Sequence, residues 1–214
     1  MANPMNRWGR IAPVLLAMLL AGCASTRMTS QVNLNPEVMG RSFSKVLVHG
    51  NFQNLEYRQL AEAKLCTELA RVTTCECLKS SEVFFPGEEY SAEQISIRLS
   101  ELKIDGVLTL QPTGSGTSST YVPQTSHTTG SATVIGNTVT GSSTTRTSGG
   151  YNVSKPWANY EAVLLSTSDG RVAWYATAAS GGNAFAGWDD LISSASSKAV
   201  SKLVSDGVFR KPEK

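Results

Sequence analysis

Cys23 is the residue whose surroundings point most directly to chemistry. It follows Leu20-Ala21-Gly22 and ends a leader in which Arg7 and Arg10 precede a short apolar run, residues 11–20. A basic start, a brief apolar core and small residues before a cut are typical of a secretory signal. The apolar run has half of the ~20 residues that a membrane-spanning helix needs, so a transmembrane anchor is not expected. We expect cleavage directly before Cys23, which leaves its thiol at the start of the mature chain.

Residues 20–23 resemble a bacterial lipobox. In that motif the cysteine sulfur takes a diacylglycerol, the peptide is cut before the cysteine, and the new amine is acylated. The resemblance implies that residues 1–22 are a lipoprotein signal peptide and that the cut lies between Gly22 and Cys23. It also implies N-acyl and S-diacylglycerol lipid on Cys23, which is enough for stable membrane attachment. An ordinary cleaved signal with a coincidental cysteine is the alternative.

The residues after Cys23 are Ala24 and Ser25. They resemble the outer-membrane sorting pattern of enteric-type bacteria rather than the pattern for inner-membrane retention. We therefore expect a protein that is lipid-anchored in the outer membrane and faces the periplasm. Residues 23–44 are rich in Ser, Thr, Asn and Gln, which predicts a flexible tether from the acylated cysteine that reaches ~60 Å when extended.

The charge balance excludes a general attraction to nucleic acid. The chain has 19 Lys and Arg against 17 Asp and Glu, and the leader contains two of the basic residues, Arg7 and Arg10, and no acid. Without the leader 17 basic residues face 17 acidic ones, so the mature chain is neutral. A nucleic-acid-binding domain normally shows an excess of positive charge.

Three further cysteines, Cys66, Cys75 and Cys77, would lie in an oxidising compartment. A disulfide from Cys66 to Cys75 or Cys77 would close a short loop and stabilise the fold by ~3 kcal/mol. Cys75 and Cys77 point to the same face of a strand, so only one of them can pair well with Cys66. Three buried thiols are the alternative. The spacing C-x-C is wrong for a zinc knuckle, and we predict no metal site.

Other reactive motifs are missing from the sequence. It contains no G-x-S-x-G, P-loop, H-E-x-x-H or dinucleotide fingerprint, and only two histidines, His49 and His127. We predict no catalytic residue, no other cofactor and no enzyme activity. A pocket that placed a carboxylate within hydrogen-bond reach of His49 would revive an enzyme acting on envelope polymers. In the loop 181–188, Phe185 and Trp188 form a contact patch or pack into the core.

The elements that must position these residues can be read from apolar spacing. Residues 46–48 suit a buried strand, and Asn54 can cap a helix. The apolar stripe of that helix is Tyr57, Ala61, Leu65, Leu69 and Val72, with Arg58, Glu62, Lys64 and Glu68 away from it. A second strand is predicted over 75–85. Ser91 and Gln94 form a capping box for a second helix, whose stripe is Ala92, Ile95, Leu99 and Leu102.

A third strand is predicted at 107–110. A hairpin follows over 160–167 and 171–178, joined at Ser168-Asp169-Gly170. Asp189 or Asp190 would cap a final helix that Gly207 ends. The fold class is α/β (α+β), with a single mixed β-sheet and about three helices in the order β-α-β-α-β-insert-β-β-α. We expect one domain over residues 45–210.

The insert, residues 113–156, is mostly Ser, Thr and Gly. Its composition predicts a disordered loop, whereas the turn signal Gly136-Asn137 predicts a long β-hairpin. Pairing outward from that turn sets Val134 against Val139 and His127 against Arg146. The same register, continued, sets Leu110 against Val163 and Leu108 against Leu165. Pro123 and Pro156 would each remove a hydrogen-bond donor from the hairpin.

The lipobox at Cys23, the strand-helix start at Lys45, the polar insert and the hairpin over 169–174 together resemble a group of uncharacterised bacterial lipoproteins. Residues 183–191 (NAFAGWDDL) are the most specific local match. The domain of that group looks like the amino-terminal domain of the Tol-system β-propeller protein and the periplasmic domain of the curli secretion channel. The resemblance implies no catalytic residue.

Lipobox and resemblance together predict a non-enzymatic outer-membrane lipoprotein that is a binding or scaffold module for an envelope component, with a protein partner of unknown identity. The alternative is a subunit of an envelope assembly or secretion complex in which the Ser/Thr/Gly insert is the contact or pore element.

Overall fold

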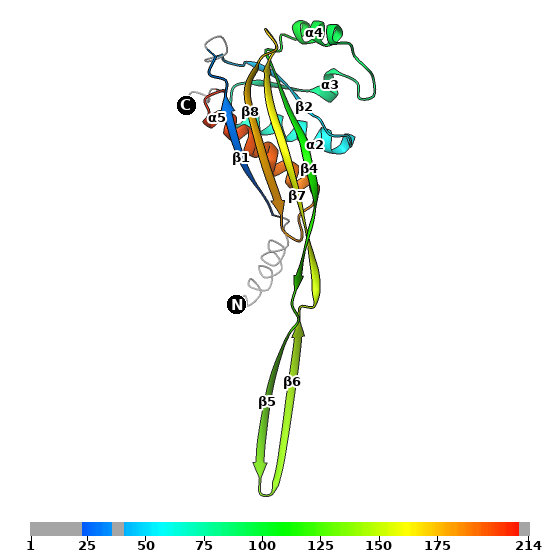
Figure 1. The fold of residues 1–214 in the computed structure, drawn as a ribbon, viewed down its shortest axis with the longest axis vertical. Helices are drawn as coiled ribbons and strands as arrows, with labels where there is room; N and C mark the ends of the chain where they lie inside the picture. The colour runs from blue at the N-terminus through cyan, green and yellow to red at the C-terminus, as the bar shows by residue number, and fades with distance from the viewer. Residues whose placement is uncertain (1–22, 36–40, 210–214) are drawn as a thin grey trace, which may run out of the picture.

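The computed structural model describes residues 23–35 and 41–209. They form a mixed six-stranded sheet in the order β1-β8-β7-β4-β2-β3 and a two-stranded sheet, β5–β6. The outer parts of β4 and β7 continue into β5 and β6, and together residues 116–157 form a ribbon that projects far from the six-stranded sheet (Figure 1). The strands are β1 (Ala24–Val32), β2 (Lys45–Gly50), β3 (Glu76–Lys79), β4 (Gly106–Val122), β5 (Thr125–Ile135), β6 (Thr138–Ser148), β7 (Tyr151–Ser166) and β8 (Val172–Gly182). The helices are α2 (Leu55–Val72), α3 (Ser80–Val83), α4 (Ala92–Glu101) and α5 (Trp188–Ser205).

The predicted fold class is confirmed. Strand β2 runs parallel to β3 and β4, and the other neighbouring strands are antiparallel, so the sheet is mixed. Helices α2 and α5 pack together on one face of it (Figure 1). The described residues contain four helices rather than about three, because the single turn α3 interrupts the segment 75–85 that was expected to be one strand.

The core lies between that face and the two helices. Trp174 of β8 is the largest side chain that is fully buried, and Leu108 and Leu164 lie beside it in the sheet. Leu65 of α2 and Leu191 of α5 are also fully buried. Burying such side chains contributes ~1.5–3 kcal/mol each, which makes this face the main source of stability.

Local signals place the helix ends. The Asn54 side chain accepts hydrogen bonds from the backbone N–H groups of Glu56 and Tyr57, so this cap is confirmed. The capping box of Ser91 and Gln94 is confirmed as well. Gly207 follows α5 with a φ of +75°, a conformation that favours glycine.

The cap predicted for α5 was wrong by two or three residues. The N-cap is Gly187, and neither Asp189 nor Asp190 occupies that position. The Asp190 carboxylate accepts a hydrogen bond from the backbone N–H of Gly187 at 2.9 Å. It sits in the first turn, where a negative charge also complements the helix dipole.

The tether predicted over residues 23–44 was wrong for residues 24–32. These residues form β1, which pairs with β8 along its whole length, from Ala24 opposite Gly182 to Val32 opposite Trp174. Residues 36–40 lie outside the described residues. The folded body therefore begins directly after Cys23 and not at Lys45.

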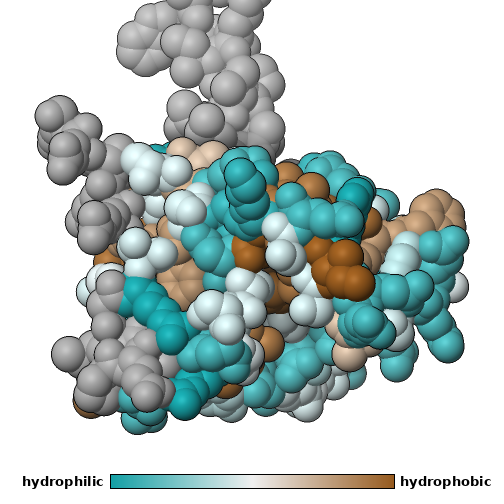
Figure 2. All heavy atoms as spheres, turned by 90° about the horizontal axis from the view of Figure 1, so that it is seen from above, coloured by the Kyte–Doolittle hydropathy of each residue, from teal (hydrophilic) through white to brown (hydrophobic). Residues whose placement is uncertain are grey.

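Helix α4 differs from the other long helices because none of its residues is buried. Its Ile95 and Leu99 line a cleft of about 370 Å³ together with Leu47 and Val107 of the sheet. Figure 2 looks onto the end of the molecule away from the ribbon and shows hydrophobic side chains in a hollow between hydrophilic ones. The predicted apolar stripe of this helix thus remains partly open to solvent.

Candidate functional site: the anchored end and the polar ribbon

Cys23 is exposed and directly precedes β1. Its carbonyl oxygen accepts a hydrogen bond from the backbone N–H of Asn183, with 3.0 Å between the two atoms. Any group attached to Cys23 would therefore be fixed at the end of the sheet. The predicted signal peptide, residues 1–22, lies outside the described residues. Of the two residues at the predicted cleavage site, Gly22 and Cys23, the structure describes Cys23.

Inward-facing polar side chains hold β1 against the body. The Thr26 hydroxyl makes hydrogen bonds with the hydroxyls of Ser180 at 2.7 Å and Ser194 at 2.8 Å. Further along, Asp206 accepts hydrogen bonds from Ser30 and from the Trp174 indole. Burial alone would raise the pKa of Asp206, but these hydrogen bonds and the charge of Lys202 together outweigh it and keep the pKa below its ordinary value. The strand is thus fixed by side chains as well as by its ladder.

The long β-hairpin, and not the disordered loop, is the form that the structure gives to the insert. Strands β4 and β7 continue beyond the sheet, and β5 and β6 extend them to a turn at Gly136, where φ is +59°. The predicted pairs Val134–Val139 and His127–Arg146 are confirmed. Pro123 falls in the break between the two ladders, where a missing N–H costs no ladder hydrogen bond.

The register predicted at the base of the ribbon was wrong by one residue. Leu110 pairs with Ala162 instead of Val163, and Leu108 pairs with Leu164 instead of Leu165. A β-bulge at Thr113, between Pro112 and Gly114, takes up the extra residue. The bulge is required because paired residues share a face of the sheet, and the core side chains of β7 are Ala162 and Leu164.

The ribbon leaves the sheet at the end where β1 begins, directly after Cys23 (Figure 1). Across the sheet, Ser25 of β1 is level with Gly181, Gly181 with Trp157, and Trp157 with Gly116. From Gly116 to the turn the chain has 20 residues, which at ~3.3 Å per residue extend roughly 65 Å beyond that row. The position of the cysteine and the direction of the ribbon are therefore linked by strand pairing.

The surface of the ribbon is polar, and its charged side chains, Arg146 of β6 and Lys155 of β7, are both basic. Both β5 and β6 are exposed throughout, and hydroxyl pairs such as Thr128 with Thr145, 2.9 Å apart, run across it. Hydrophobic side chains are found at its two ends and also midway along it, where Tyr121 and Tyr151 are exposed. Val134, Ile135 and Val139 are exposed at the tip, and the Trp157 indole lies over Gly116 at the base.

The two aromatic residues of the loop after β8 have different surroundings. Phe185 is 64% exposed. Trp188, the first residue of α5, packs against the core and lines a cavity. Of the two expected roles, surface exposure thus applies to Phe185 and packing applies to Trp188.

Cys66 and Cys77 form a disulfide that joins α2 to β3. Cys75, the other candidate for pairing with Cys66, is a buried free thiol. Burial raises the pKa of Cys75 to about 12, so it stays protonated and unreactive at neutral pH.

His49 belongs to a buried polar cluster. Its Nδ1 lies 2.7 Å from the Ser80 hydroxyl, which donates a hydrogen bond to Glu62. The Glu62 carboxylate also accepts from the backbone N–H groups of Gly50 and Ser81. Sequence reasoning placed Glu62 away from the buried stripe of its helix, which was wrong because these partners come from β2 and α3 and cannot be seen in the helix itself.

This cluster does not have the geometry of an activated nucleophile. The nearest Glu62 oxygen is 3.9 Å from His49 Nδ1, beyond hydrogen-bond reach, and the Ser80 proton points to the carboxylate instead of to the imidazole. Burial, which outweighs the attraction of Glu62, lowers the pKa of His49. The cluster links β2, α2 and α3.

In the part of the chain that the structure describes, no three His, Cys, Asp or Glu side chains come together as a metal site. Over the same residues, no helix combines the length and apolar character needed to cross a membrane.

Comparison with known proteins gives only distant structural likeness. No known family and no curated protein matches the sequence. Among solved structures, the PelC dodecamer from Paraburkholderia phytofirmans is 14% identical, covers 88% of this chain and 99% of its own, and has a TM-score of 0.46. A single-residue variant of the same dodecamer gives 14% identity, 87% and 99% coverage, and a TM-score of 0.47.

Lipoprotein GNA1162 from Neisseria meningitidis is 15% identical, covers 77% of this chain and 95% of its own, and has a TM-score of 0.40. TM-scores this low give no information about the function of this chain. The resemblance to the Tol-system and curli domains stays a prediction.

Proposed function

We propose that this protein is a non-enzymatic, outer-membrane-anchored periplasmic lipoprotein that acts as a binding or scaffold module for an envelope component. One observation supports it above the others. Cys23, the residue that the lipobox would acylate, is fixed by β1 to the same end of the sheet from which the exposed ribbon projects. Anchor and ribbon then form one oriented unit.

The contacts of the polar side chains support binding rather than reaction. The cluster of His49, Ser80 and Glu62, which joins a histidine, a serine and a carboxylate, uses its hydrogen bonds to connect secondary-structure elements. The free thiol of Cys75 is buried. These groups lack the mutual geometry that nucleophilic or acid–base catalysis requires.

The ribbon supplies the contact surface in this proposal. Each of its outer edges presents unpaired backbone N–H and C=O groups, and an isolated two-stranded hairpin is only marginally stable in water. A protein partner that adds a strand to one edge would satisfy those groups and hold the ribbon straight. Most of its side chains are neutral Ser and Thr, and Arg146 and Lys155 give it a small positive charge.

Crosslinking in intact cells tests this function. A photoreactive residue at Thr133 on the ribbon should give a discrete crosslinked protein, whereas the same residue at Thr177, exposed on β8, should not. Equal crosslinking from both positions, or none from any ribbon position in a folded and membrane-bound protein, would contradict a docking role for the ribbon.

A second candidate function is favoured by the length of the ribbon. It extends roughly 65 Å past the row of Ser25, which exceeds the ~40–45 Å of a bilayer with its headgroups. A lipid on Cys23 would direct the ribbon toward that bilayer, as expected of a subunit whose ribbon is a contact or pore element in an assembly.

Mass measurement of the detergent-solubilised full chain separates the two functions. The assembly is supported if the full chain has a multiple of the single-chain mass. Replacing residues 117–156 by a two-residue Asn-Gly turn should then reduce the measured mass to that of one chain. A single-copy mass for both proteins argues against a ring and leaves the scaffold function.

A further inference from the structure

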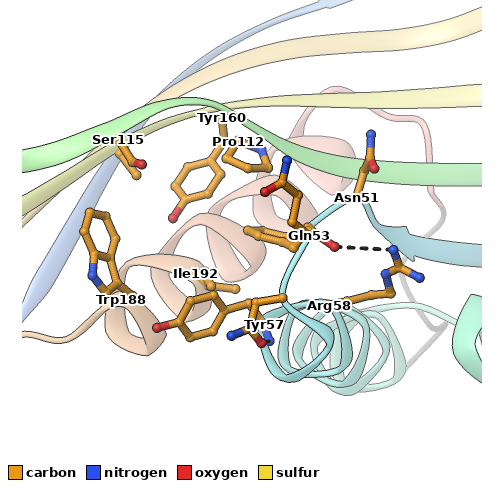
Figure 3. A pocket seen from close by; sticks show the side chains of 12 residues that line it. Asn51, Gln53, Tyr57, Arg58, Pro112, Ser115, Tyr160, Trp188 and Ile192 are labelled. Carbon is orange, nitrogen blue, oxygen red and sulfur yellow. Dashed lines mark hydrogen bonds between the residues drawn. The ribbon is translucent and has the colours of Figure 1, made fainter. Parts of the chain in front are cut away.

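A cavity of about 610 Å³ lies where the ribbon joins the body (Figure 3). Its walls come from the residues before α2, from α2 itself, from β4 and β7, and from the first turn of α5. The volume is in the range of sites that enclose a small molecule, ~300–1,000 Å³. It does not include Cys23, His49 or the disulfide.

Four aromatic side chains line this space, those of Phe52, Tyr57, Tyr160 and Trp188. Figure 3 shows Tyr57 of α2, Tyr160 of β7 and Trp188 of α5 around the same opening. Aromatic rings of this kind offer flat apolar faces with a polar group at one edge. Such walls fit a ligand that is itself ring-shaped, with C–H groups on its faces and polar groups around its rim.

The Tyr160 hydroxyl is the most informative group in the cavity. Tyr160 is only 2% exposed, yet no hydrogen bond joins its hydroxyl to any of the described residues. Figure 3 shows the hydroxyl directed into the cavity. Burial raises the pKa of Tyr160, so the group remains a neutral phenol that can donate and accept. The hydroxyl is not one of the fully buried unpaired atoms, so it reaches the open space of the cavity, where a ligand can replace water as its hydrogen-bond partner.

Arg58 provides a second unpaired donor. One of its terminal nitrogens donates to the backbone carbonyl of Phe52 at 3.3 Å, but its Nε is buried and has no partner among the described residues. Arg58 lines the same cavity. Because this Nε is fully buried, a guest could bond to it only after the side chain moves, so the Tyr160 hydroxyl is the unpaired group within reach of a guest.

The remaining lining is neutral. Asn51 and Gln53 contribute amides and Ser115 a hydroxyl, and no carboxylate of the described residues faces the cavity. Arg58 is the single charged side chain among its walls. This combination of aromatic faces with amides and hydroxyls matches a ligand that is uncharged and bears several hydroxyl groups.

We propose that this cavity binds a saccharide ring, a hexopyranose unit of an envelope glycan, with its faces on the aromatic walls and a ring hydroxyl bonded to Tyr160. The C–H faces of a pyranose are apolar and its hydroxyls lie around the rim, which is the pattern that the walls require. The proposal extends the scaffold function and does not depend on acylation of Cys23.

An extended peptide fits the site less well. The free edge of β4 beside the cavity contains Pro112, which lacks an N–H, and the bulge at Thr113, which twists the strand. Both features prevent the regular ladder that a bound peptide strand would need. A ring that docks through its faces needs no such ladder.

Calorimetric titration of the full chain tests the proposal, in a detergent without sugar headgroups because these would compete. The probes are chitotetraose, cellotetraose and maltotetraose, with tetraalanine as the peptide probe. We expect at least one tetrasaccharide to bind and tetraalanine not to. Tyr160→Phe should weaken that binding about tenfold, the effect of one lost hydrogen bond.

Two cavity variants and one control variant separate an effect on binding from an effect on stability. Tyr160→Phe should leave the unfolding temperature unchanged, because the hydroxyl has no protein partner to lose, and Trp188→Leu should also weaken binding. Tyr175→Phe, on an exposed tyrosine outside the cavity, should change neither property. The proposal is overturned if no tetrasaccharide binds at millimolar concentration, if affinity is unchanged in both cavity variants, or if tetraalanine binds there instead.

Discussion

The backbone N–H of Asn183 donates a hydrogen bond to the carbonyl oxygen of Cys23 across 3.0 Å. This contact continues the β1–β8 ladder past its last strand pair, Ala24 with Gly182. It connects Cys23, the residue expected to begin the mature chain, to the loop that leads into α5. A lipid on Cys23 would therefore fix the orientation of the whole body and not only its location.

The side chains that hold β1 in place should contribute measurably to stability. Thr26→Val removes the hydroxyl that bonds to Ser180 and Ser194 and leaves the buried Ser180 with one partner fewer. We expect the free energy of unfolding, measured in urea, to fall by about 1–3 kcal/mol. Thr29→Val, the same change on the exposed side of the same strand, should have an effect within about 0.5 kcal/mol. Equal losses in both variants would contradict this packing of β1.

Gly116 is needed for the fit of Trp157 at the base of the ribbon. A Cβ at Gly116 would lie 2.9 Å from the indole of Trp157, so Gly116→Val must push the ring outward. We expect a loss of about 1–3 kcal/mol in the free energy of unfolding and a red shift of tryptophan fluorescence. The matched control is Gly181→Val in the neighbouring strand, where a Cβ meets nothing within 4 Å. An unshifted spectrum in Gly116→Val would show that the ring does not lie there.

The disulfide should stabilise the fold through the loop that it closes. Cys66 and Cys77 are 11 residues apart, and closing a loop of that size contributes about 3 kcal/mol by chain entropy. Reduction, or Cys66→Ala with Cys77→Ala, should lower the free energy of unfolding by about that amount. Cys75→Ala should retain sensitivity to reductant, because Cys75 is not part of the bond. A Cys75→Ala protein that no longer responds to reductant would assign the bond to Cys75.

Stability should fall on mild acidification because of His49. Its pKa in the folded state is lowered, chiefly by burial, from the ordinary value of 6.5. The unfolded chain then takes up a proton more readily, so the stabilisation is complete above pH 6.5 and is lost as the pH falls below that value. We expect the free energy of unfolding to decrease between pH 7.5 and 5.5.

Two histidine variants check this assignment. His49→Gln should remove the decrease, whereas His127→Gln, on the exposed ribbon, should keep it. The carboxyl groups of Glu68 and Asp169 do not interfere in this range. Hydrogen bonds from Arg71 and Arg41 hold the pKa of Glu68 and Asp169 below their ordinary values, so their effect appears only below about pH 4. A decrease that survives in His49→Gln would refute the assignment.

Local signals predicted much of this fold. The turn at Gly136-Asn137 determines the ribbon register down to Gly114, and Asn54 and Ser91 mark the starts of two helices. The register beyond the bulge at Thr113 could have been found from the alternation of Ala162 and Leu164 with the residues between them. It was missed because pairing was extended from the turn alone.

Strand β1 shows what single-strand patterns leave hidden. Its inward positions include Thr26 and Ser30, whose hydroxyls are satisfied by Ser180, Ser194 and Asp206. Polar residues on both faces look like a solvated tether when those partners, more than 150 residues away in sequence, are unknown. The burial of Glu62 was missed for the same reason. The unpaired hydroxyl of Tyr160 likewise appears only once the walls around it are assembled.

The most direct test of the account is cell fractionation of the wild-type chain and Cys23→Ser, with mass spectrometry of the mature amino-terminal peptide. The account predicts that the wild type sediments with the outer membrane and that its Cys23 peptide has the added mass of a diacylglycerol and an acyl chain. Cys23→Ser should stay uncut and be missing from the outer-membrane fraction, while Cys75→Ser should behave as the wild type. A Cys23→Ser protein that is trimmed at the same point and still sediments with the outer membrane would contradict it.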